Sequence, residues 1–313
     1  MQEDLLMRSE PILLATNGTK DADAAVSAAD QLSEMTGRQV TVIAVLEPPP
    51  HVASENGFVV SVDTFWADRR NALHARVRRQ ILEVAGCDPG WPIEIRTGNP
   101  AGTIANAAAS LDAAVIVMGL GKQHLLDRAI GSETTLHTLR AACAPILAVP
   151  PTFAILPQRA VVATDFGDAA VAAAQEALAL IPSLTDLLVL HVAPRWDMQP
   201  AAYAQWGEDY RRAVDPAMER VINELDAPFT VTVTREIREG KVTKQLFAAA
   251  DEFDAQLFIV GSKGLGLLER MLVGSTASGI MRGAQDAVFA FPIAALATHG
   301  AKFATTGKET SDT

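Results

Sequence analysis

Short apolar runs alternate with longer amphipathic stretches along most of the chain. Apolar runs occur at Ile12 to Thr16, Val40 to Leu46 and Ile93 to Ile95, and helical patterns occur at Asp21 to Met35 and Thr64 to Val84. In the second helical pattern, apolar residues recur every three or four positions, as expected when one helix face packs on a core. Near-continuous apolar strands that alternate with helices are typical of parallel sheets. The pattern therefore predicts an α/β fold.

Local signals place the remaining elements of this first unit. Asn99 followed by Pro100 is a favourable helix start, because Asn caps a helix and Pro suits its first turn. We expect that helix to end near Ser110 and two further strands at Ala114 to Met118 and Ile146 to Val149. The unit then has five strands.

The same order of elements occurs a second time. Arg96 to Gly119 aligns with Arg238 to Gly261 at a spacing of 142 residues, and Pro150 aligns with Pro292 at the same spacing. The front halves align at a slightly larger spacing, so the two units differ by loop residues, which we place around Pro48 to Val62. The second set of strands is expected near Ala160–Thr164, Leu187–Val192, Thr230–Arg235, Leu257–Val260 and Val288–Phe291.

Length and composition agree with two compact domains. The chain has 313 residues, of which about half are apolar, and this is enough for two separate cores. We expect domain 1 over residues 9–151, domain 2 over residues 157–298 and a flexible tail over residues 299–313. Each domain is predicted to be a Rossmann-like, doubly wound parallel sheet of five strands with the order 3-2-1-4-5.

Glycines follow the fourth strand of domain 2 in a pattern suited to anions. Gly261-Ser262-Lys263-Gly264 is separated by nine residues from Gly274-Ser275, where a helix is expected to begin. Residues without a Cβ let peptide N–H groups approach phosphate oxygens, and a helix N-terminus adds partial positive charge. The loop lacks the Gly-Lys-Ser/Thr ending of a Walker P-loop. The alternative is a tight turn required only for packing.

Asp165 ends the first strand of domain 2, and Gly261 ends the fourth. With the order 3-2-1-4-5 these strands flank the point where strand order reverses, and ligands of doubly wound sheets bind there. Residues distant in sequence are thus expected to meet in one crevice. Asp165 could equally be a turn or helix-capping residue, because Asp is favoured in both positions.

Charge and the remaining side chains exclude several functions. The formal net charge of −11 disfavours nucleic acid as a partner, and no apolar run is long enough for a membrane span. The N-terminus lacks the pattern of a signal peptide, so a cytoplasmic location is expected. Cys87 and Cys143 lack zinc-site spacing, and we expect buried, inert thiols and no metal site. His191 is expected to be a satisfied core histidine rather than a catalytic base.

The residues of domain 2 resemble the universal stress protein family, and the whole chain resembles its tandem form from Pro11 to Pro292. The resemblance depends on Val162-Ala163-Thr164-Asp165-Phe166, Leu190-His191-Val192 and the glycine pattern above. It implies ATP binding in domain 2, with or without Mg²⁺, and pairing of the fifth strands into an intrachain pseudo-dimer. It places the following residues around the nucleotide: Thr164, Asp165, Val192, Gly261, Lys263, Gly264, Gly274, Ser275 and Thr276.

Domain 1 departs from the family pattern. Asn17 replaces the acidic residue, Lys122 stands where a glycine is expected, the loop to Gly131 is one residue shorter, and Glu133 follows it. A carboxylate there would repel phosphate, so domain 1 is predicted to be a degenerate, structural half. The alternative is a modified anion site in which Gly121 and Lys122 take part.

These observations predict an adenine-nucleotide-binding stress-response or signalling module with its site in domain 2. The alternative is a nucleotide-free structural or regulatory scaffold of the same fold. No catalytic residues are expected, and ATP hydrolysis would be slow at most, because fast phosphoryl transfer needs a charge clamp and a positioned nucleophile. An adenylate-transferring enzyme would need a second basic and histidine-containing loop, which we do not find. An unidentified protein partner and a homodimer remain open.

Overall fold

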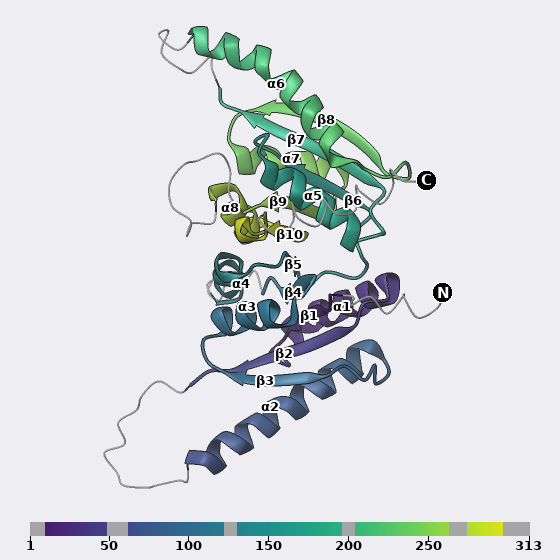
Figure 1. Ribbon diagram of the computed structural model, residues 1–313, viewed down its shortest axis with the longest axis vertical. Helices are drawn as coiled ribbons and strands as arrows, with labels where there is room; N and C mark the ends of the chain where they lie inside the picture. Colours follow the sequence, from purple (N-terminus) through teal and green to yellow (C-terminus); the bar gives the residue numbers. More distant parts are fainter. Residues whose placement is uncertain (1–9, 49–61, 122–129, 196–203, 263–273, 297–313) are drawn as a thin grey trace, which may run out of the picture. The chain divides into compact units, whose positions relative to one another are not determined.

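The chain divides into two compact units, Met1–Ile155 and Leu156–Thr313, called domain 1 and domain 2 below. The computed structural model describes residues 10–48, 62–121, 130–195, 204–262 and 274–296 (Figure 1). Residues 299–313, expected to form a tail, lie outside these ranges. None of the described helices is long and apolar enough to cross a membrane.

Domain 1 contains a parallel sheet with the strand order β3-β2-β1-β4-β5. The pairing register places Ile12 opposite both Val40 and Val115, so the central strand is hydrogen-bonded to a neighbouring strand along both of its edges. The strands are β1 (Ile12–Ala15), β2 (Val40–Leu46), β3 (Ile93–Thr97), β4 (Val115–Gly119) and β5 (Ile146–Val149).

The helices of domain 1 form two packed pairs. α1 packs against α2, and α3 packs against α4 (Figure 1). Right-handed crossovers place these pairs on opposite faces, because the chain moves outward through β2 and β3 and then returns to β4 and β5. The helices are α1 (Asp23–Thr36), α2 (Val62–Ala85), α3 (Pro100–Leu111) and α4 (Ile130–Ala141), with a 3₁₀ turn η2 at Lys20–Ala22.

Local sequence accounts for two of the helix ends. The Asn99 side chain accepts a hydrogen bond from the Gly102 amide at 3.3 Å, with Pro100 in the first turn of α3. α1 ends at Gly37, which has φ +69° and donates its amide to the Ser33 carbonyl at 2.8 Å. Glycine suits this left-handed position because it has no Cβ. The start of α3 at Asn99 agrees with the sequence prediction.

Domain 2 repeats the architecture with the order β8-β7-β6-β9-β10, which is again 3-2-1-4-5 when its strands are numbered along the chain. α5 packs against α6, and α7 packs against α8 (Figure 1). The strands are β6 (Arg159–Ala163), β7 (Asp186–Ala193), β8 (Thr232–Glu239), β9 (Leu257–Gly261) and β10 (Ala287–Phe291). The helices are α5 (Asp168–Leu180), α6 (Ala204–Leu225), α7 (Val242–Phe253) and α8 (Ser275–Gly283), followed by a 3₁₀ turn η5 at Ile293–Ala295.

The predicted fold class and strand order are confirmed, but some details differ. β8 extends to Glu239, four residues beyond the predicted end. Exposed and half-buried positions are mixed along it, and Arg238 pairs with Glu236. Such a strand lacks the continuous apolar run of its neighbours. The prediction that Cys87 and Cys143 are buried is wrong, since both are exposed.

Candidate functional site

A cavity of about 130 Å³ lies at the carboxyl ends of β6, β7 and β9 in domain 2. Five of the predicted site residues line it: Thr164, Asp165, Val192, Gly261 and Thr276. They come from three strand ends and the first turn of α8. The structure therefore brings together residues that are more than 100 positions apart in the sequence.

The other predicted residues have different positions. Gly274 is the N-cap of α8 and donates its amide to the Ser262 carbonyl at 2.6 Å. Ser275 is the first residue of α8 and is exposed. Lys263 and Gly264 lie outside the described residues. The start of α8 contains no acidic residue in its first turn, which suits an anion.

The turn after β6 is held by its own side chains. The Thr164 hydroxyl accepts a hydrogen bond from the Phe166 amide at 2.9 Å, and the Asp165 carboxylate accepts one from the Gly167 amide at 3.1 Å. Phe166 adopts φ +68°, a conformation that residues with a side chain rarely take. The Arg220 guanidinium donates to the Phe166 carbonyl at 2.5 Å and fastens the turn to α6. Asp165 is thus a turn residue, and its role as a ligand remains a prediction.

His191 supports this turn from β7. It is 7% exposed, its Nδ1 lies 2.8 Å from the Thr164 carbonyl oxygen, and its Nε2 contacts the Tyr210 hydroxyl. A carbonyl can only accept, so Nδ1 carries the proton and Nε2 of the neutral ring accepts from Tyr210. The Phe166 ring stacks on His191 with centroids 4.1 Å apart. The prediction of a satisfied core histidine is confirmed.

Burial lowers the pKa of His191 below 6.5, although the hydrogen bond to Thr164 and the charge of Asp165 oppose the shift. The unfolded chain therefore binds the proton more readily, and domain 2 should lose stability as the pH falls below about 6.5. We expect His191→Gln to reduce this pH dependence, measured by urea unfolding at pH 7.5 and 5.5 with hydrogen exchange of β6 and β7. The exposed His137→Gln is the control. An unchanged slope in His191→Gln would contradict the assignment.

Domain 1 builds the same turn from different residues. The Thr16 hydroxyl accepts from the Gly18 amide at 3.1 Å, and the Asn17 side chain accepts from the Thr19 amide at 3.0 Å. Gly18 has φ +74°, matching Phe166 in domain 2, and Arg76 donates to the Asn17 carbonyl at 3.0 Å as Arg220 does to Phe166. Replacement of Asp by Asn therefore preserves the turn, because either side chain offers the accepting oxygen.

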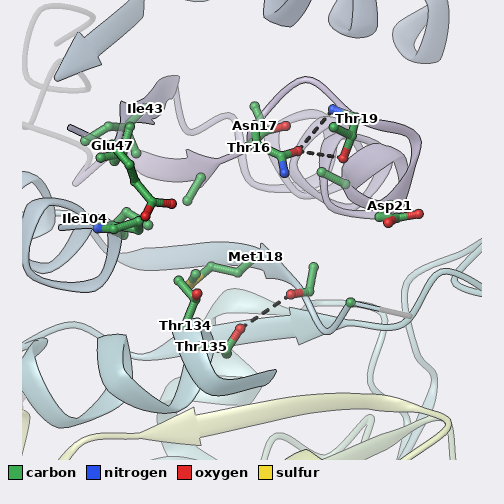
Figure 2. A pocket seen from close by; sticks show the side chains of 16 residues that line it. Thr16, Asn17, Thr19, Asp21, Ile43, Glu47, Ile104, Met118, Thr134 and Thr135 are labelled. Carbon is green, nitrogen blue, oxygen red and sulfur yellow. Dashed lines mark hydrogen bonds between the residues drawn. The ribbon is translucent and has the colours of Figure 1, made fainter. Parts of the chain in front are cut away.

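A larger cavity, of about 460 Å³, lies beside this turn in domain 1 (Figure 2). Figure 2 shows Asn17 and Thr19 joined by two hydrogen bonds at one side of it, and Thr134 and Thr135 on α4. The cavity is lined by Ala15, Thr16, Asn17, Thr19, Asp21, Ala22, Ile43, Val45, Glu47, Pro100, Ile104, Met118, Gly119, Gly121, Thr134 and Thr135. The size of this cavity was not predicted from the sequence.

Burial fixes the correspondence between α4 and α8. Buried residues of α4 recur in α8 at the spacing of 142 residues, so Thr134 corresponds to Thr276 and Glu133 to Ser275. The matching buried positions are Thr135, Thr138, Leu139 and Ala142 in domain 1, and Ala277, Ile280, Met281 and Ala284 in domain 2. Gly274 therefore corresponds to Ser132 rather than to Gly131. The loop of domain 1 appears one residue shorter only when it is measured to Gly131. Both threonines line their cavities.

Sequence reasoning missed the walls that the second helix pair contributes. Val242 and Leu246 of α7 line the domain 2 cavity, and Pro100 and Ile104 of α3 line the domain 1 cavity. The available signal was the right-handed crossover, which places these helices beside the first strand on the face that contains the cavity. Such apolar residues are otherwise indistinguishable from core residues in the sequence.

Comparison with known proteins agrees with the repeat. A universal stress protein from Archaeoglobus fulgidus DSM 4304 is 19% identical, with a TM-score of 0.57, over 91% of this chain and 96% of its own. A protein of unknown function from Pseudomonas aeruginosa PAO1 is 15% identical, with a TM-score of 0.61, over 96% and 99%. At these identities the likeness concerns the fold. A search of the curated proteins found no match.

The model of one protein family matches nearly the whole chain in two consecutive segments. The segments are residues 9–150 and 157–292, which correspond to the two halves of the internal repeat and to the two domains. The chain therefore belongs to the Universal stress protein family and carries two of its domains in tandem.

Proposed function

We propose that the protein is an adenine-nucleotide-binding stress-response or signalling module that holds ATP in domain 2. The observation that carries the proposal is the cavity at the carboxyl ends of β6, β7 and β9, lined by Thr164, Asp165, Val192, Gly261 and Thr276. The sequence alone predicts these five residues. Their convergence at the switch point of the sheet is the arrangement that nucleotide sites of doubly wound folds require.

Each residue of this site has a proposed place around ATP. Main-chain groups around Val192 would meet adenine, and Asp165 and Gly261 would lie by the ribose. The N-terminus of α8 would offer the amide groups of Ser275 and Thr276 to the phosphates, and Gly274, whose own amide is bonded to the Ser262 carbonyl, would leave room for their approach. Lys263 and Gly264 are proposed to complete the phosphate side.

Close packing explains why glycine occupies position 261. A Cβ on Gly261 would lie 2.9 Å from the Ala169 Cβ and 3.0 Å from the Ala169 carbonyl carbon. The end of β9 thus approaches the start of α5 closely, which keeps the cavity at the strand ends narrow. Asp165 is the one acidic residue among the described residues that line it, so we expect ATP hydrolysis to be slow at most.

The second candidate is a nucleotide-free scaffold of the same fold, and the size of the domain 2 cavity favours it. Small-molecule sites usually enclose about 300–1,000 Å³. The domain 2 cavity, at about 130 Å³, lies below this range. Binding would then require movement around the cavity. The scaffold requires no such change.

Filling the cavity from α8 separates these candidates. Thr276→Tyr should weaken ATP binding at least tenfold, because the ring would occupy space at the strand ends, whereas Thr134→Tyr at the matching position of domain 1 should leave it unchanged. Isothermal calorimetry with ATP and Mg²⁺ measures the affinity and stoichiometry, and chromatography after denaturing extraction detects co-purified nucleotide.

We expect about one adenine nucleotide per chain. No binding and no co-purified nucleotide would favour the scaffold, and loss only in Thr134→Tyr would move the nucleotide to domain 1. Two predictions concern assembly: pairing of the fifth strands into a pseudo-dimer within the chain, and a homodimer beyond it. Light scattering after size exclusion tests the homodimer, because it gives the number of chains in the particle.

A further inference from the structure

We propose that the cavity of domain 1 is a second binding site, separate from the proposed nucleotide site, and that it takes a small aromatic amine rather than a phosphorylated ligand. The proposal goes beyond ATP binding in domain 2 and does not depend on it. It rests on the size of the cavity, its apolar walls and the charges on its lining.

The cavity has the size and walls of a small-molecule site. Its volume of about 460 Å³ falls within the usual range of about 300–1,000 Å³. Apolar side chains from β2, α3 and β4 line much of it, among them Ile43, Val45, Ile104 and Met118. These side chains offer an aromatic or aliphatic body a surface on which to pack, and transfer of that body from water would supply the main affinity.

The polar groups of the turn after β1 are already hydrogen-bonded within the protein. The Thr16 hydroxyl donates to the Gln80 side chain at 2.7 Å, and the Asn17 side-chain oxygen accepts from both the amide and the hydroxyl of Thr19. Figure 2 shows the two bonds between Asn17 and Thr19. Groups that are paired in this way shape the cavity wall, and they do not present a cluster of donors to an anion.

The charges on the lining are negative. Asp21 and Glu47 line the cavity, and no Lys, Arg or His occurs among its described lining residues. Glu47 is exposed at the end of β2 and has no hydrogen-bond or ion-pair partner in the described part of the chain. A carboxylate at the rim of a partly enclosed, apolar cavity attracts a cation and repels phosphate.

The charge at the start of α4 strengthens the preference of this cavity for a cation. α4 has Glu133 in its first turn, whereas α8 in domain 2 has no acidic residue in the corresponding turn. A carboxylate in the first turn opposes the partial positive charge with which a helix N-terminus binds anions. The two halves of the repeat thus differ by one negative charge at the same place, and domain 1 suits an ammonium group.

Three indole compounds of nearly the same shape test the proposal: tryptamine, which is cationic, tryptophol, which is neutral, and indole-3-acetate, which is anionic. Binding is measured on the full chain by ligand-observed NMR and calorimetry. We expect tryptamine to bind at least tenfold more tightly than indole-3-acetate, with tryptophol between them. Equal or tighter binding of indole-3-acetate, or no detectable binding of tryptamine, would overturn the proposal.

Two variants locate the site. Glu47→Gln should weaken tryptamine about threefold and leave tryptophol unchanged, since an exposed ion pair contributes little but is specific to the cation. Thr134→Tyr should abolish binding of both compounds, and Thr276→Tyr should leave both unaffected. Retention of tryptamine binding in a folded Thr134→Tyr variant, checked by thermal unfolding, would refute the location.

Thr134→Tyr and Thr276→Tyr are tested with ATP as well as with tryptamine, so the amine site and the nucleotide site can each be rejected without the other. Loss of ATP binding in Thr276→Tyr together with intact tryptamine binding supports both sites. Tryptamine bound by wild type and ATP bound by neither domain would sustain the amine site and reject the nucleotide site.

Discussion

Replacing Gly261 with valine is expected to lower the free energy of unfolding of domain 2 by about 3 kcal/mol, the upper part of the range for overpacked cores. Gly261 ends β9 directly beside the start of α5. A Cβ at this position would lie 2.9 Å from the Ala169 Cβ, 3.0 Å from its carbonyl carbon and 3.1 Å from its oxygen. Two of these atoms belong to the backbone, so the helix itself must move, and the β-branched side chain adds two further methyl groups.

The effect should be confined to domain 2. Hydrogen exchange measured by mass spectrometry should show faster exchange in β6 and β9 and unchanged exchange in β1 and β4, since each domain has its own core. ATP binding, where wild type shows it, should be lost as well. Gly102→Ala is the matched control. Gly102 lies in the first turn of α3, and the nearest atom to its added Cβ would be the Asn99 side-chain oxygen at 4.0 Å, so the change should be neutral or slightly stabilising. A Gly261→Val variant as stable as wild type would show that α5 moves freely.

Replacing Gln80 with leucine is expected to lower the free energy of unfolding of domain 1 by about 2–3 kcal/mol, because three hydrogen bonds of a buried group are removed together. Gln80 is 5% exposed on α2. Its Oε1 accepts from the Thr16 hydroxyl at 2.7 Å, and its Nε2 donates to the Thr19 carbonyl at 2.6 Å and to the Asp23 carboxylate at 2.7 Å. The side chain therefore joins α2 to the turn after β1 and to the start of α1.

The internal repeat supplies the control for this change. Arg76 on α2 and Arg220 on α6 hold the equivalent turns of the two domains, and Gln80 and Glu224 each follow one helical turn later. Glu224 therefore occupies the position of Gln80. Its side chain, however, is 43% exposed and pairs with Arg220 at 2.9 Å. Glu224→Leu should cost domain 2 less than about 1 kcal/mol, as for other exposed ion pairs. The measurement is urea unfolding with hydrogen exchange of β1 and β6. Equal losses in the two domains would contradict a special role for the Gln80 network.

Tryptamine binding provides a second readout of the Gln80 network. The turn that Gln80 supports contributes Thr16, Asn17 and Thr19 to the domain 1 cavity. Loosening this turn in Gln80→Leu should weaken tryptamine binding, while Glu224→Leu leaves it unchanged. The two readouts connect the stability of the turn with the shape of the cavity.

The two domains show how a repeated turn can serve different environments. Thr16 and Thr164 cap equivalent turns, Gly18 and Phe166 take the same positive φ, and the arginines of α2 and α6 fasten them. Beyond that shared frame, the fourth helix of each domain begins with different charges. We infer that the fold preserves the place of the site while the local charges select the ligand.

The sequence alone determined the fold class, the strand order, the internal repeat and five of the twelve residues that line the domain 2 cavity. These features have local or periodic causes: apolar runs form strands, helical periodicity forms amphipathic helices, and a capping residue such as Asn99 begins a helix. A known sheet order then places the strand ends, and with them Asp165 and Gly261, at one crevice.

Only the tertiary structure decided the sizes of the two cavities, the partners of His191 and the network of Gln80. Each of these depends on side chains that are far apart in the sequence, such as Gln80 with Thr16 and His191 with Tyr210. A sequence pattern shows that a position is apolar or polar, but not which distant atom lies within hydrogen-bonding distance. For the same reason domain 1, predicted to be degenerate, proved to contain the larger cavity, since its volume is set by packing among β2, β4, α3 and α4.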